Sequence, residues 1–221
     1  LPFDAFLASP ADSTKMDFRK LDYLVHHHAI SYTYSATLLY YYFQNKLKYS
    51  NKIAAFAPDY TIESDVSDPF LEHFQPLPGA EAEVIGVTGI INGDQYIGDR
   101  ATKKIFLQNA EKYDILHLAM HTSINDTLPL YSKMVFSADN SAGNDRTLNT
   151  YEIYNLKLKS DMVVLSGCNT GTGKLQKGEG VMSLARAFLY AGCPSIIMTL
   201  WNVEDVASAS IMIDFYQNVK N

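Results

Sequence analysis

Short, nearly uninterrupted apolar runs alternate with segments whose apolar positions recur at helical spacing, from about residue 52 to the end of the chain. The runs predict strands over 52–58, 113–121, 132–138, 161–168 and 193–201. The segments between and after them predict helices over 78–91, 101–112, 179–192 and 204–219. Strands without polar alternation are typical of strands buried on both faces. The pattern therefore predicts an α/β fold, a mostly parallel β-sheet with helices on both faces.

Outside this alternation the pattern is less regular. Residues 1–20 predict irregular structure, and 21–35 predict a short helix or turn followed by a β-rich run. A helix is expected over 35–47 with Ser35 as its cap, and a polar surface loop over 59–78. Gly192 is expected to end the helix before it. No linker that would divide the chain is visible.

Composition excludes several classes of function. The chain has 221 residues, a net charge of −6 and no basic patch, so nucleic acid is not expected as a partner. No apolar run approaches the ~20 residues of a membrane span. Two cysteines give neither a disulfide framework nor a zinc spacing, which indicates a reducing, cytoplasmic compartment with no metal or other cofactor. The first residue is Leu1 and no signal peptide is visible, so we expect either a piece of something longer or an ordered core without its disordered ends.

Two reactive side chains stand where predicted strands end. His121 ends YDILHLAMH and Cys168 ends DMVVLSGC, next to a glycine-rich stretch. Ligand sites of open α/β sheets lie at the carboxyl ends of strands, so these side chains would meet if the two strands are neighbours. An imidazole can activate a thiol or protonate a leaving amine. The alternative is that Cys168 is simply a small buried residue.

Other candidates carry less chemistry. Cys193 starts a strand and so faces the opposite end of the sheet, and His117 is expected in the core or behind His121. The three histidines 26–28 would point to opposite faces of a strand, which disfavours a shared ion. HLAMH has Leu118 where a zinc helix needs glutamate, and GTGKLQKGEG lacks phosphate-loop spacing.

Several motifs together resemble one family. SGCNTG, GEG and TLWNVED follow each other in the second half, and LPFDAF, LPGAEAEV, DRATKKIF and DILHLAMH occupy the first. In this order they resemble a CHAT domain, a caspase-like module often attached to tetratricopeptide repeats and related to caspases, gingipains and separase. The resemblance covers residues 1–221 as a single domain. It implies that an N-terminal hairpin, regulatory repeats and a C-terminal helix and strand lie outside this chain.

The resemblance implies a cysteine endopeptidase. Cys168 and His121 match the family's catalytic dyad, with Cys168 attacking the scissile carbonyl and His121 protonating the leaving amine. The backbone N–H groups of Thr122 and Cys168 would hold the oxyanion. Many members have glycine where this chain has Thr122, which restricts the turn. Gly167 stands in place of the more usual alanine, a difference expected to be harmless.

Substrate binding is expected next to these residues. Trp201, Asn202 and Val203 match the segment along which an extended peptide would add by main-chain hydrogen bonds. Three acidic residues are candidates for a pocket that selects Arg or Lys, with Asp205 preferred: Asp126, Glu179 and Asp205. The alternative for Glu179 and Asp205 is that they complement helix dipoles, and for Asp126 that it is a solvated loop residue.

Three classes of function therefore stand beside each other. The first is a regulated endopeptidase that cleaves a protein substrate after a basic residue and needs a partner or repeat as a trigger. The second is a catalytically silent domain that binds a peptide or acts as a scaffold. The third is an acyltransferase or other thiol enzyme, which would need a cofactor pocket.

Overall fold

A computed structural model describes most of the chain. The described residues are 3–11, 17–44, 52–60, 74–125, 127–139, 145–167, 179–199 and 205–220. Contacts group the chain into two compact units, Leu1–Lys46 and Leu47–Asn221. The single domain over residues 1–221 stays a prediction.

The first unit is built of short helical turns and one helix. Its elements are η1 (Phe3–Ala5), η2 (Phe18–Lys20), η3 (Leu24–His26) and α1 (Ala36–Gln44). Ser35 caps α1, because its hydroxyl accepts a hydrogen bond from the Leu38 N–H at 3.1 Å, as predicted. The β-rich run expected after the histidines is wrong, since residues 27–35 contain no strand. Alternating aromatic and polar residues there have no neighbouring strand with which to pair.

The second unit is organised around a five-stranded parallel sheet in the order β2-β1-β3-β7-β8. Its strands are β1 (Ile53–Pro58), β2 (Gly93–Gly98), β3 (Ile115–Ala119), β7 (Met162–Ser166) and β8 (Ser195–Met198). Because every pair is parallel, all five carboxyl ends lie along one edge of the sheet. β2 was not predicted, since its sequence GDQYIG lacks an apolar run.

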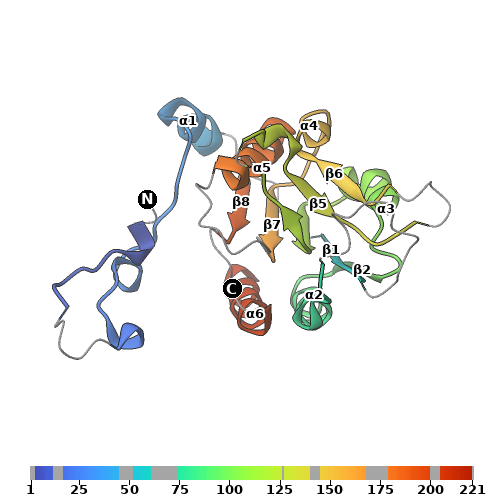
Figure 1. Ribbon diagram of the computed structural model, residues 1–221. Helices are drawn as coiled ribbons and strands as arrows, with labels where there is room; N and C mark the ends of the chain where they lie inside the picture. The colour runs from blue at the N-terminus through green and yellow to red at the C-terminus, as the bar shows by residue number, and fades with distance from the viewer. Residues whose placement is uncertain are drawn as a thin grey trace. The chain divides into compact units, whose positions relative to one another are not determined.

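Helices cover both faces of this sheet (Figure 1). The helices of the unit are α2 (Pro78–Ile90), α3 (Lys103–Asn109), α4 (Thr150–Ile153), α5 (Glu179–Tyr190) and α6 (Asp205–Lys220). α2 and α6 pack on the face that carries Ile115 and Val164. α3, α4 and α5 pack on the other face, against Leu116 and Leu165. The predicted α/β fold is confirmed.

A small antiparallel sheet extends from the end of β3. It contains β4 (Thr122–Ser123), β5 (Lys133–Val135) and β6 (Thr147–Asn149), in that order. Two short 3-10 turns, η5 (Ala110–Lys112) and η6 (Pro129–Tyr131), complete the second unit's elements among the described residues. Of the small sheet, the sequence predicted only the strand over 132–138.

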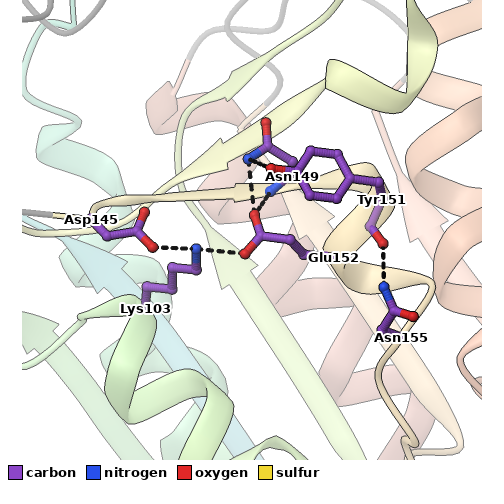
Figure 2. Close-up of polar contacts among 6 residues, drawn as sticks. All are labelled: Lys103, Asp145, Asn149, Tyr151, Glu152 and Asn155. Atoms are coloured by element: carbon purple, nitrogen blue, oxygen red, sulfur yellow. Dashed lines mark hydrogen bonds and ion pairs between the residues drawn. The ribbon is translucent and has the colours of Figure 1, made fainter.

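Lys103 ties this sheet to the main body (Figure 2). Its nearly buried ammonium lies 2.7 Å from Asp145 and 2.7 Å from Glu152. Burial alone would lower the pKa of Lys103, but the hydrogen bonds that its ammonium donates to Asp145 and Glu152 outweigh burial and leave that pKa raised. Glu152 also accepts from the Asn149 N–H at 2.8 Å, which caps α4. The cluster therefore joins the start of α3 to β6 and α4.

The end of α5 follows the sequence prediction. Gly192 has a φ of +113°, and a Cβ there would lie 2.6 Å from the Leu158 carbonyl oxygen. The Cys193 N–H donates to Phe188 and the Gly192 N–H to Leu189. This is the Schellman arrangement, which glycine permits because it has no Cβ.

Candidate functional site

The strand ends that carry the two candidate residues lie side by side. Ala119 of β3 pairs with Ser166 of β7, and the Met120 N–H donates to the Ser166 carbonyl at 3.0 Å. His121 follows Met120, and Cys168 follows Gly167. The neighbouring strands on which the predicted pairing depended are therefore present. Cys168 itself lies outside the described residues.

Gly167 is held closely against β3. Its φ is +96°, and a Cβ atom at this position would lie 3.1 Å from the Met120 carbonyl oxygen. A left-handed φ is costly for any residue with a Cβ. This backbone conformation and this contact both favour glycine, which agrees with the expectation that glycine in place of alanine does no harm here.

The His121 imidazole is fully buried and held by a backbone carbonyl. Its Nε2 lies 2.6 Å from the Gln75 carbonyl oxygen. A carbonyl can only accept, so Nε2 carries a proton in this contact. In the neutral imidazole, Nδ1 is then the atom with a lone pair. The arrangement fixes the tautomer and leaves proton exchange to Nδ1.

Two aromatic rings flank the same imidazole. The Tyr60 ring centroid lies 4.6 Å from that of His121, and the Phe74 centroid lies 4.9 Å away. The sequence predicted a polar surface loop over 59–78, so neither ring was expected to lie against the histidine. Their only signal was an aromatic residue at each end of a polar segment. Gln75 contributes a carbonyl, which every residue type has, so no side chain could have marked it.

Thr122 follows the histidine as the first residue of β4. Thr122 pairs with Met134 of β5. In the preceding pair, the Val135 N–H donates a hydrogen bond to the His121 carbonyl at 3.0 Å. Bonded and non-bonded pairs alternate in antiparallel sheets, so the Thr122 N–H points away from β5. Its hydroxyl is buried and has no hydrogen-bond partner among the described residues.

The other predicted site residues are only partly placed. Glu179 is the first residue of α5 and Asp205 the first residue of α6. Asp126, Trp201, Asn202 and Val203 lie outside the described residues. The structure therefore brings the His121 and Gly167 ends of the site together and leaves the predicted substrate pocket as a prediction.

His117 lies in the core, as the sequence indicated. Its Nε2 is 2.9 Å from a Glu83 carboxylate oxygen of α2, and its Nδ1 is 3.2 Å from the Tyr216 hydroxyl of α6. All three residues are buried. Burial and the nearby Glu83 charge raise the pKa of Tyr216 well above its usual range. The group joins β3 to both helices on one face of the sheet.

Cys193 does not belong to the site. It lies two residues before β8, is fully buried, and its thiol contacts the Ser195 carbonyl at 3.3 Å. Burial raises the pKa of Cys193 to about 12. A thiol in this environment is a poor nucleophile.

Neither a group of metal ligands nor a membrane-spanning helix is found in the part of the chain that the structure describes. Among the described residues, no three His, Cys, Asp or Glu side chains lie close enough to share an ion. Of the three adjacent histidines, His27 contacts Asp22 at 2.5 Å. The described helices include none with the length and apolar character needed to cross a bilayer.

The parallel sheet, its two helical layers and the histidine at a strand end define a caspase-like α/β fold. The family model "CHAT domain" matches residues 1–221, so this chain belongs to the CHAT domain family. CHAT domains are part of the caspase-like peptidase superfamily.

Two curated proteins are similar to this chain in sequence. Tetratricopeptide repeat protein 28 of Mus musculus is 25% identical over 203 residues, and that of Homo sapiens is 26% identical over 203 residues. Each match covers 78% of this chain but only 8% of the relative. The chain is therefore similar to a small part of much longer proteins that are named for tetratricopeptide repeats.

Proposed function

We propose that this chain is a cysteine endopeptidase domain with Cys168 as nucleophile and His121 as the group that transfers protons. The observation that carries the proposal is the Gln75 carbonyl bound to His121 Nε2 at 2.6 Å, at the end of a strand paired with the one that leads to Cys168. A histidine whose Nε2 is bound to a backbone carbonyl uses its Nδ1 to give and take protons. Membership of the CHAT family supports the same assignment.

The chemistry follows from these roles. The Cys168 thiolate attacks the scissile carbonyl carbon, and the carbonyl π electrons move to oxygen. The N–H groups of Thr122 and Cys168 stabilise that oxyanion. Protonated His121 gives its Nδ1 proton to the amine as the C–N bond breaks, which leaves a thioester. Water then attacks the thioester while neutral His121 takes a water proton. The C–S bond breaks, the carboxylic acid is released, and the Cys168 thiolate and protonated His121 are restored.

Substrate preference belongs to the proposal as well. A protein substrate would lie in extended form along Trp201, Asn202 and Val203. Cleavage after Arg or Lys rests on acidic residues in the same region, with Asp205 first, then Asp126 and Glu179. The relatives' name, tetratricopeptide repeat protein, supports repeats in the full protein that bind a partner and regulate the domain.

A second candidate is a catalytically silent CHAT domain that binds peptides. Two observations favour it. His121 is fully buried, so a substrate would need to displace part of its cover, and Thr122 replaces a glycine that many members have after the histidine. In this case Cys168 would not react with peptide electrophiles.

Covalent labelling tests both candidates. Peptide acyloxymethyl ketones ending in Arg or in Asp are incubated with the full-length protein, and adducts are measured by intact mass. We expect one adduct with the Arg probe, absent in Cys168→Ala and retained in the matched control Cys193→Ala. No adduct in the presence of the protein's repeats and partner would favour the silent domain. An adduct retained in Cys168→Ala would contradict the dyad.

A further inference from the structure

Tyr60 lies two residues after the end of β1 and takes no part in the chemical steps proposed above. Its hydroxyl accepts a hydrogen bond from the His121 N–H at 3.0 Å and donates one to the Val135 carbonyl at 2.8 Å. We propose that Tyr60 is a positioning residue that sets where the His121 imidazole sits. This inference rests on the proposed function of His121 as the proton-transferring partner of Cys168.

The hydroxyl occupies a place in the backbone ladder. His121 and Val135 face each other at the start of the small sheet, and the Val135 N–H donates to the His121 carbonyl at 3.0 Å. In a regular antiparallel pair of this kind, the His121 N–H would return a bond to the Val135 carbonyl. Here Tyr60 is inserted between those two groups and bonds to both. The strand pair is therefore held open at the histidine.

The same residue also contacts the imidazole. The Tyr60 ring lies 4.6 Å from the His121 ring at an interplanar angle of 55°, and 6.2 Å from the Phe74 ring. One side chain thus fixes the histidine through its backbone and through its ring. Burial raises the pKa of the Tyr60 hydroxyl above its usual range, so it stays protonated and able to donate.

Removal of the hydroxyl leaves two choices for the backbone. Either the His121 N–H and the Val135 carbonyl close on each other, which moves the histidine toward β5, or both lose a partner. In the first case the imidazole is drawn away from the Gln75 carbonyl, and in the second the His121 backbone loses one of the contacts that fix it. Proton transfer is sensitive to sub-ångström changes in such positions. A merely structural tyrosine would lower stability without a specific effect on His121.

Tyr113 offers a matched control. Its hydroxyl is also bonded on both sides, to the Asp94 carboxylate and to the Tyr96 hydroxyl at 3.0 Å, but next to β2 rather than at His121. Tyr60→Phe and Tyr113→Phe each delete one hydrogen-bonded phenol. Only the first deletes a contact with the histidine. His117 is a second, internal control, because it lies on the same strand and has its own buried partners.

The test uses two readouts on the full-length protein. Turnover of an Arg-ending fluorogenic peptide gives kcat and KM, and deuterium exchange at the imidazole C2 position, followed by mass spectrometry, reports on each histidine separately. For Tyr60→Phe we expect kcat to fall at least tenfold with KM within twofold. C2 exchange should change at least threefold at His121 and not at His117. Tyr113→Phe should change neither kcat nor exchange.

The outcomes separate this inference from the proposed function. Either readout changing no more in Tyr60→Phe than in Tyr113→Phe overturns the positioning role. A wild-type protein without turnover or labelling, or a Cys168→Ala variant with full turnover, contradicts the endopeptidase. C2 exchange needs no catalysis, so in that case the His121 result alone decides whether Tyr60 positions the histidine.

Discussion

A Cβ atom on Gly167 would lie 3.1 Å from the carbonyl oxygen of Met120. These two residues directly precede Cys168 and His121, so the two strand ends that lead to the candidate dyad lie backbone against backbone at this point. The spacing between the ends is therefore set by main chain and tolerates little added volume.

Gly167→Ala should weaken both stability and activity. The φ of +96° and the Met120 contact are expected to cost about 1–2 kcal/mol of unfolding free energy. Gly89→Ala in α2 is the control, because a Cβ there meets nothing within 4 Å and should stabilise the helix by about 0.5–1 kcal/mol. Urea denaturation measures both. Equal midpoints for the two variants would contradict the close contact.

His121→Ala should abolish most turnover. Loss of a positioned acid and base typically costs about 10²–10⁴-fold in rate. We expect at least a 100-fold lower kcat with a peptide ending in Arg. The matched control is His27→Ala, which removes a histidine paired with Asp22 in the first unit and should leave kcat within twofold. Full turnover in His121→Ala would remove this residue from the mechanism.

Thiol counting should find Cys193 protected. With its pKa raised to about 12, Cys193 is protonated at pH 8 and therefore a poor nucleophile. Iodoacetamide should therefore modify one cysteine, Cys168, in the native protein and two in denaturant. Native Cys168→Ala should take up none. Fast native modification of Cys193 would show that the segment before β8 opens readily.

Replacement of His117 should be costly, and the cost should depend on Glu83. His117→Leu leaves the Glu83 carboxylate buried without its partner, which is expected to destabilise the fold by about 3–5 kcal/mol. The double variant Glu83→Leu/His117→Leu should lose less than the sum of the two single variants. Denaturant unfolding of all four proteins gives the coupling. Simple additivity would mean that the 2.9 Å contact carries no energy.

The contribution of the Lys103 cluster to the free energy of unfolding should depend on pH. Burial would raise the pKa of Glu152, but the bonds from Lys103 and Asn149 outweigh it and leave that pKa below 4.5. A carboxyl with a lowered folded-state pKa stabilises above its unfolded value and loses this effect as pH falls through the folded value. The stability difference between wild type and Glu152→Gln should therefore be constant above about pH 4.5 and shrink below it.

Lys103→Ala tests the other half of the cluster. Two charge-assisted bonds of a nearly buried ammonium are lost, and we expect about 2 kcal/mol lower stability at pH 7. Lys112→Ala removes an exposed lysine whose ammonium donates to the Asn109 side chain at 2.9 Å, and its stability should stay within about 0.5 kcal/mol of wild type. Thermal unfolding compares them. Equal losses of stability in the two variants would mean that the Lys103 cluster does not stabilise the fold.

The sequence by itself determined the layers and the histidine. Continuous apolar runs predicted β1, β3, β7 and β8, since strands buried on both faces need apolar side chains at every position. It also marked Ser35 and Gly192 as helix ends, because capping depends on local geometry that a single residue type satisfies. His121 stood out because a polar residue at the end of a buried strand needs a reason to be there.

Only the tertiary structure decided what surrounds His121. Gln75 acts through its carbonyl, Tyr60 through one hydroxyl set between two backbone groups, and Gly167 through a positive φ against Met120. β2 has a polar sequence and nevertheless forms a strand, because the edge of β1 is available for pairing. Such contacts join residues far apart in the chain and depend on backbone atoms that all sequences share. They leave no pattern along the sequence, so the fold alone brings them together.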